Sequence, residues 1–303
     1  FPWPRQVRPG IWRASPLVLP LHRYAWVRKL NKIILSLTLR WHARILGMKK
    51  PLVWTYNPLM ADLCAGLPHL GVVYHCVDDL AAAPRISSNA IREGEAELAR
   101  ITDICFTTSP ALQDRMKTLF SNTVYEPNVC EYDMFRAATA RELAEPDDLR
   151  KIPHPRLLFI GALSEYKVDF DLIETVARRM PEVHWVMIGP EGEGQPDSRQ
   201  LTRLPNIHVL GPRPYNTLPA YMRYVLPAMN NAYTASMFPM KFFEYLAGGL
   251  QVIATRLPAL KEFKELYFPT DDADSFAAAV TAVLQGSKRD AAQIDLACRQ
   301  HCW

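Results

Sequence analysis

Short apolar segments alternate with amphipathic segments along much of this 303-residue chain. Apolar runs at 51–56, 71–77, 103–109 and 123–129 have the length of buried strands. Between them, apolar positions recur with helical spacing at 60–67, at 89–101 and from 110 onward, where Ser109 and Pro110 form a helix start signal. Strands that alternate with helices predict βαβ units and a parallel sheet.

A charged segment with several prolines, residues 138–154, interrupts this pattern, which then begins again. The second series predicts strands at 156–162, 184–190, 206–212, 224–229, 251–255 and 266–268, and helices at 170–179, 218–224, 239–247 and 273–284. We therefore predict an α/β fold of two Rossmann-like, doubly wound domains that face each other across a cleft. The first is 1–137, the linker 138–154 and the second 155–285, and residues 286–303 follow the second domain.

The first fifty residues form a separate pattern. An apolar stripe at helical spacing lies within residues 24–46 and comprises Trp26, Leu30, Ile33, Leu37 and Trp41. Residues 1–50 also hold eleven Lys or Arg and no acid, so with a total of +4 the other 253 residues carry −7. The helix alone fits a core-packed element or a membrane-surface element equally well. The charge favours an anionic membrane surface or an anionic acceptor, and no nucleic-acid module accompanies it.

Other classes of protein are excluded or disfavoured by composition. No apolar run is long enough to span a membrane as a helix. Six cysteines are scattered without C-x-x-C spacing, which indicates reduced thiols in a reducing compartment and no metal site.

The segment "PMKFFEYLAGG" (239–249) is the first candidate for chemistry. Pro239 at a helix start and Gly248 with Gly249 at its end delimit a short helix. Lys241 in the first turn opposes the helix dipole unless an anion binds there, so the segment predicts a phosphate site. Loops at the same sheet edge add candidate ligand-binding residues. With the helix start, the set is Gly161, Lys167, Arg213, Tyr215, Pro239, Met240, Lys241 and Glu244.

Asp78 and Asp79 end the predicted strand at 71–77, at the carboxyl edge of the first sheet. One of these carboxylates is a candidate general base that deprotonates an acceptor hydroxyl. The alternative is a pair that caps the following loop.

The segment "FPMKFFEYLAGGLQVIAT" resembles the donor-site segment of GT-B glycosyltransferases, with matches that include Pro239, Lys241, Glu244 and Tyr245. "LLFIGALSEYKVDFDLI", "YHCVDDLAAAP" and "TTSPAL" extend the resemblance over most of residues 50–303. The chain is similar to family 4 and family 1-like bacterial glycosyltransferases of exopolysaccharide and cell-wall polymer assembly. Its end, "CRQHCW", resembles the family's last helix, which implies that a helix in 286–303 returns to the first domain.

The resemblance implies a metal-independent hexosyltransferase without a cofactor, whose substrate is a UDP- or GDP-sugar. Glu244 would then bind the ribose hydroxyls, while Lys167 and Lys241 would stabilise the leaving diphosphate. The catalytic base would be Asp78, with Asp79 second. The acceptor would be lipid-linked or a polysaccharide, reached by a cytoplasmic protein bound peripherally to the inner face of the cytoplasmic membrane.

Departures from the family pattern leave alternatives open. Ala162 and Ser236 replace an Arg and a Glu of the family, which favours a non-catalytic membrane-associated partner subunit. The residues that argue against this alternative are Lys167, Lys241, Glu244 and Asp78. A nucleotide-sugar epimerase of the same fold is the other alternative. No first strand with a Gly-rich loop precedes Trp26, and residues 223–232 are short for their elements, so we expect segments to be missing at both places.

Overall fold

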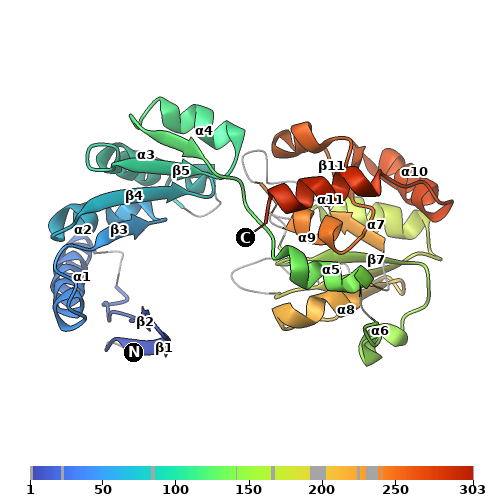
Figure 1. Cartoon of the computed structure of the whole chain (residues 1–303), viewed down its shortest axis with the longest axis horizontal. Helices are drawn as coiled ribbons and strands as arrows, with labels where there is room; N and C mark the ends of the chain where they lie inside the picture. Colours follow the sequence, from blue (N-terminus) through green and yellow to red (C-terminus); the bar gives the residue numbers. More distant parts are fainter. Residues whose placement is uncertain are drawn as a thin grey trace. The chain divides into compact units, whose positions relative to one another are not determined.

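A computed structural model describes residues 3–21, 24–82, 86–140, 142–164, 168–191, 203–223, 226–229, 238–239 and 241–302. The chain forms two units, Phe1–Glu126 and Pro127–Trp303, each built on its own parallel sheet (Figure 1).

The first unit contains the predicted series of strands and helices. Its parallel sheet has the order β3-β4-β5-β6, with β3 at Leu52–Thr55, β4 at Gly71–Cys76, β5 at Ile104–Thr107 and β6 at Thr123–Tyr125. The helices are α1 at Ala25–Ile45, α2 at Ala61–Gly66, α3 at Ser88–Leu98 and α4 at Pro110–Lys117. An antiparallel hairpin of β1 (Arg5–Arg8) and β2 (Ile11–Arg13) precedes them and was not predicted.

The two faces of this sheet differ in burial. Tyr74, Cys76 and Cys105 point to one face and pack with side chains of α2, α3 and α4 in a common core. The alternate positions on the other face are more exposed. Trp54 is 47% exposed and stacks on Phe106 with ring centroids 5.5 Å apart.

Helix α1 has one buried side and one exposed apolar side. Val27 is fully buried, and the Asn31 side chain accepts a hydrogen bond from the Leu19 amide at 2.8 Å. The predicted stripe lies on another side, where Trp26 and Leu37 are each 62% exposed. The stripe therefore does not pack into the core of the first unit. No helix in the described parts of the chain is long and apolar enough to cross a membrane.

The second unit has a six-stranded parallel sheet of order β12-β11-β10-β7-β8-β9. Its strands are β7 (Arg156–Ile160), β8 (His184–Ile188), β9 (Ile207–Val209), β10 (Leu226–Met229), β11 (Ile253–Thr255) and β12 (Phe268–Thr270). Its helices are α5 (Tyr132–Ala140), α6 (Asp147–Arg150), α7 (Phe170–Arg179), α8 (Leu218–Met222), α9 (Lys241–Ala247), α10 (Ala273–Leu284) and α11 (Ala291–Gln300).

Helices cover both faces of this second sheet, as parallel sheets require. Alternate residues of β7 enter two separate cores: Leu157 packs with α7 and α10, whereas Leu158 packs with α5, α8, α9 and α11. Figure 1 shows α11 beside α9 within this unit, and the two helices contact each other. A return of the C-terminal helix to the first unit stays a prediction.

The structure divides the chain earlier than the sequence pattern indicated. The predicted linker 138–154 lies inside the second unit, where it includes the end of α5 and all of α6. Leu149 and Ile152 of this segment are buried in the core that α9 also enters. The charges and prolines of the segment therefore belong to α6 and the loops beside it, which pack within the second unit.

Candidate active site

The carboxyl ends of β7, β8 and β9 are joined by backbone hydrogen bonds. The Gly161 amide donates to the Ile188 carbonyl at 2.9 Å, and the Gly189 amide donates to the Gly211 carbonyl at 3.2 Å. A Cβ on Gly189 would lie 1.8 Å from the Gly161 carbonyl oxygen, and Gly189 has φ +155°. Glycine is therefore required there, and the predicted donor-binding Gly161 lies at this tightly packed sheet edge.

Tyr245 fixes α9 to the same edge. Its hydroxyl accepts a hydrogen bond from the Ile160 amide at 2.6 Å, and its side chain is fully buried. Burial raises the pKa of Tyr245, so the hydroxyl stays neutral. Tyr245 matches the family motif, but the motif alone does not indicate what its side chain does. The structure shows that it holds α9 against β7, which orients the preceding residue, Glu244.

Three predicted donor-binding residues, Tyr215, Lys241 and Glu244, lie together. The Tyr215 hydroxyl donates to Glu244 Oε1 at 2.9 Å, and Lys241 Nζ donates to Glu244 Oε2 at 2.7 Å. Lys241 Nζ also lies 4.8 Å from the centre of the Tyr215 ring, a cation–π distance. The ring of Tyr215 in turn contacts Phe135 of α5 edge to face at 5.5 Å. Each carboxylate oxygen of Glu244 therefore has a fixed partner.

Burial sets the electrostatics of this cluster. The Glu244 side chain is only 6% exposed. Desolvation raises the pKa of Glu244 above its ordinary value, while Lys241 and Tyr215 act in the opposite direction and the nearby charge of Glu131 adds to the rise. Desolvation, then the charge of Glu244, raises the pKa of Tyr215 as well, so its hydroxyl remains a donor.

Arg213, which was predicted to bind the donor, forms hydrogen bonds with two side chains of its own unit. Its guanidinium donates to Asp148 Oδ2 at 2.5 Å and to the Tyr221 hydroxyl at 2.9 Å. Burial opposes ionisation of Asp148, but hydrogen bonds from Arg213 and Tyr221 lower its pKa below the ordinary value. In this structure Arg213 therefore ties the loop after β9 to α6 rather than joining the Glu244 cluster.

The remaining donor-binding predictions divide between described and undescribed residues. Pro239 is buried, and its carbonyl accepts the Phe242 amide at 3.0 Å at the start of α9. Lys167, Met240 and Ser236 lie outside the described residues.

In the first unit, Asp79 belongs to a network with two arginines and a buried glutamate. Its Oδ2 accepts from Arg92 at 3.1 Å, and Oδ1 lies 3.6 Å from an Nη of Arg115. Both arginines also bind Glu95, which is fully buried. In addition, Asp79 Oδ1 accepts the Ala81 amide at 3.2 Å. These contacts favour the loop-capping interpretation for Asp79.

Asp78 is joined to the same turn through its backbone. Its carbonyl accepts the Leu80 amide at 3.1 Å, immediately after the carboxyl end of β4. Sequence reasoning missed Arg92, Glu95 and Arg115, because no motif links helices α3 and α4 to this turn. A partial sequence signal for these three residues was the adjacent pair Asp78 and Asp79, because two neighbouring carboxylates need hydrogen-bonding or cationic partners.

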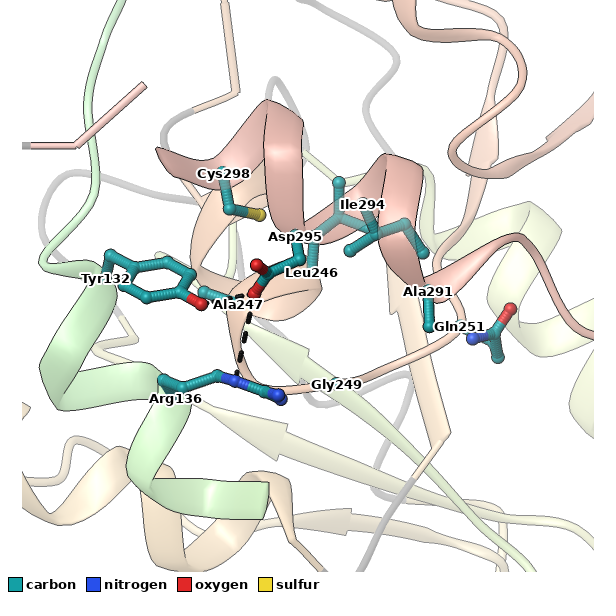
Figure 2. Close-up of a pocket in the computed structure, with 10 residues that line it drawn as sticks. All are labelled: Tyr132, Arg136, Leu246, Ala247, Gly249, Gln251, Ala291, Ile294, Asp295 and Cys298. Atoms are coloured by element: carbon teal, nitrogen blue, oxygen red, sulfur yellow. Dashed lines mark hydrogen bonds and ion pairs between the residues drawn. The ribbon is translucent and has the colours of Figure 1, made fainter. Parts of the chain in front are cut away.

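A small pocket lies at the other end of α9 and has a different character (Figure 2). Its volume is about 80 Å³, and side chains of α5 and α11 line it together with the segment after α9. Figure 2 shows Arg136 directed toward Asp295, with 3.9 Å between Nε and Oδ1, and Asp295 also accepts from Tyr132. Pockets for nucleotide-sized ligands are several times larger. We interpret this pocket as a packing gap beneath α11.

No group of three or more His, Cys, Asp or Glu among the described residues is arranged to hold a metal ion. Lys241 is the cation of the described cluster with Tyr215 and Glu244. Metal independence stays a prediction.

Comparisons with known proteins match part of the chain to a family. Residues 154–286 match the family described as Glycosyl transferases group 1. TuaH of Bacillus subtilis (strain 168), assigned as a teichuronic acid biosynthesis glycosyltransferase, is 29% identical over 218 residues, which are 65% of this chain and 53% of TuaH. This chain thus spans about half the length of that relative.

Solved structures share the fold at low sequence identity. Sucrose-phosphate synthase from Thermosynechococcus elongatus superposes with a TM-score of 0.73 at 15% identity, over 93% of this chain and 76% of the synthase. HepE of Anabaena, in complex with UDP and glucose, superposes with a TM-score of 0.69 at 17% identity, over 95% of this chain and 80% of HepE. The predicted fold of two Rossmann-like α/β domains is confirmed.

Proposed function

We propose that this chain, in which residues 154–286 match the Glycosyl transferases group 1 family, transfers a sugar from a nucleoside-diphosphate sugar to a glycan or lipid-linked acceptor. The resemblance of residues 239–255 to GT-B glycosyltransferases is confirmed, because this segment lies within the matched residues 154–286. The UDP bound to HepE supports a nucleotide-sugar donor for this chain.

The contact of Glu244 with both Tyr215 and Lys241 is the observation that carries the proposal. A buried carboxylate held by a tyrosine hydroxyl is suited to accept hydrogen bonds from two hydroxyl groups of a ribose. In the proposed mechanism, Lys241 Nζ leaves Glu244 Oε2 and binds the donor diphosphate, while Tyr215 keeps Oε1 in place. Lys241, with Lys167, then stabilises the charge that develops on the leaving diphosphate, without a metal ion.

Asp78 is the proposed base at the acceptor. In an inverting transfer it takes the proton of the acceptor hydroxyl as that oxygen attacks the anomeric carbon and the bond to the diphosphate oxygen breaks. In a retaining transfer Asp78 would position the acceptor instead. Asp79 then holds the turn through Arg92 and Arg115, and it is the second choice for the base.

We further propose that the acceptor is reached at the inner face of the cytoplasmic membrane, in exopolysaccharide or cell-envelope glycan synthesis. The exposed stripe of α1 supports this location, since Ile33 is 56% and Leu37 62% exposed on a helix that also carries Lys29 and Arg44. An apolar face flanked by basic residues is typical of helices that lie in the membrane interface.

The test is to incubate the protein with UDP- and GDP-sugars, with and without lipid-linked acceptors and with and without EDTA. Sugar transfer that needs an acceptor and persists in EDTA is expected. Conversion of the donor sugar without an acceptor would instead identify an epimerase. Nucleotide binding without any turnover would identify a non-catalytic subunit, and loss of transfer in EDTA would contradict metal independence.

A further inference from the structure

A second pocket lies in the first unit, at the C-terminal end of α1. Its volume is about 560 Å³, and three cations line it: Arg40, Arg44 and Lys49. The rest of the lining is largely apolar and includes Met48, Leu67 and Pro68. None of the described lining residues carries a carboxylate. Three cations around a concave, partly apolar site form a complementary environment for an anion that carries apolar groups.

The backbone at this helix end leaves the cations available. Gly47, with φ +71°, closes a Schellman motif in which its amide donates to the Arg44 carbonyl at 3.1 Å and the Met48 amide donates to the Ala43 carbonyl at 2.8 Å. These amides satisfy carbonyls that would otherwise attract the cations. Arg40 is held in place because its Nη2 donates to the Gly66 carbonyl at 2.6 Å. A fixed guanidinium loses less freedom when it binds an anion.

The pocket lies at the opposite sheet edge from Asp78. Lys49 precedes β3, and Leu67 and Pro68 precede β4, whereas Asp78 follows β4. The six residues of β4 span about 20 Å at a rise of roughly 3.3 Å per residue. A ligand in this pocket is therefore not at the proposed site of sugar transfer.

We propose that this pocket binds the phosphate headgroup of an anionic phospholipid in the bilayer. The exposed apolar side chains of α1 continue to the helix end at which the pocket lies. There Ile45 is 54% exposed and Met48, which lines the pocket, is 46% exposed. Acyl chains follow these apolar side chains while the phosphate contacts the three cations. A free phosphate has no apolar group that could contact the apolar side chains that line the pocket. This inference rests on the proposed membrane contact and is independent of sugar transfer.

The direct test is titration of the full chain with dihexanoyl-phosphatidylglycerol below its micelle concentration. Saturable binding at one site is expected, and Arg44→Gln with Lys49→Gln should weaken it about tenfold or more. The matched control, Arg100→Gln with Lys117→Gln, removes the same charge from exposed positions of the first unit outside the pocket and should change affinity less than about twofold. Equal losses in the two double variants would overturn the proposal, as would absence of saturable binding.

Two comparisons separate the lipid from other sources of the signal. Inorganic phosphate should bind at least tenfold more weakly than the short-chain lipid, and equal binding would identify a free-anion site instead. Vesicles with phosphatidylglycerol in 0.5 M NaCl, where the Debye length is about 4 Å, should retain the wild type and the control but not the pocket variant. Vesicle binding that persists equally in all three proteins would leave the membrane contact standing and refute the pocket.

Discussion

Lys241 Nζ lies 2.7 Å from Glu244 Oε2, so two residues with separate proposed tasks at the donor bind each other in this structure. The pair is three residues apart on α9 and the carboxylate is nearly inaccessible to solvent. A donor must therefore exchange this ion pair for two new contacts, one to a ribose and one to a diphosphate. After this exchange Lys241 has the anionic diphosphate as its partner, whereas Glu244 exchanges a cation for neutral ribose hydroxyls.

Replacing Glu244 by Gln tests its role at the donor without opening a cavity. The amide oxygen can accept the Tyr215 hydroxyl, but the charge that attracts two further donors is lost. Hydrogen bonds to a charged group are worth about 1.5–3 kcal/mol, so calorimetry should show UDP-glucose affinity lowered roughly tenfold to a hundredfold. The exposed Glu262→Gln in the same unit is the control. Unchanged affinity in Glu244→Gln would remove Glu244 from the donor site.

The raised pKa of Glu244 predicts a pH dependence of donor affinity. As pH falls toward the ordinary Glu range, Glu244 takes up a proton earlier than an exposed Glu and then accepts ribose hydroxyls less well. UDP-glucose affinity should therefore fall between pH 8 and pH 5, and the Gln variant should show a flatter profile. Parallel profiles in the two proteins would assign the titration to another group.

The raised pKa of Glu244 also makes the free energy of unfolding depend on pH, in the opposite direction to donor affinity. The unfolded chain releases the Glu244 proton at the ordinary pKa of 4.5, below the raised value in the folded protein. Between the two values the folded state binds more protons, so this residue lowers the free energy of unfolding as pH rises. Denaturation of wild type and Glu244→Gln should thus differ less at pH 4 than at pH 7.

Hydrophobic patterns predicted most of the core elements, because these strands and helices have a local signal, but they did not predict the β1–β2 hairpin, α5 or α6. The stripe at 26–41 predicted α1, and apolar runs predicted the core strands of both sheets. Lys241 and Glu244 could be placed together because residues three apart face the same side of a helix. Burial of the stripe was not predictable, since a single helix pattern does not say which neighbour covers it.

Contacts between distant positions account for what sequence reasoning missed. Arg213 resembles a donor-binding cation in its loop, but its partner Asp148 is 65 positions away in what looked like a linker. Leu149 and Ile152 give too little apolar pattern to reveal that this segment is buried. Likewise, Arg115 reaches Asp79 only because α4 and the turn after β4 meet in the folded unit. No local spacing encodes such pairs.

The two acids after β4 should respond differently to substitution. Asp78→Asn is expected to lower kcat by about 10²–10⁴-fold with little change in donor affinity, since a base acts only in transfer. Asp79→Asn weakens contacts to Arg92 and Arg115 and should lower the free energy of unfolding by about 1–3 kcal/mol. Kinetics and denaturant unfolding of both variants test this. A large loss of kcat in a fully stable Asp79→Asn would reverse the two assignments.

Reversing the polarity of the α1 stripe tests the membrane contact. Ile33 and Leu37 are 56% and 62% exposed, so Ile33→Glu with Leu37→Glu should leave the thermal unfolding temperature nearly unchanged. Full burial of such side chains is worth about 1.5–3 kcal/mol each, so binding to anionic vesicles should fall about a hundredfold or more. Nucleotide binding should be unaffected, because the residues proposed to bind the donor lie in the second unit.

The control adds the same charge elsewhere in the first unit, at the exposed start of α3, as Ser88→Glu with Asn89→Glu. Each basic residue near an anionic surface contributes about 1 kcal/mol, which salt screens, so wild-type binding should also weaken as NaCl is added. Neutral phosphatidylcholine vesicles should retain much less protein. Equal sedimentation with neutral and anionic vesicles would contradict the electrostatic part of the contact. Unchanged binding of the stripe variant would mean that α1 meets a protein or glycan surface instead.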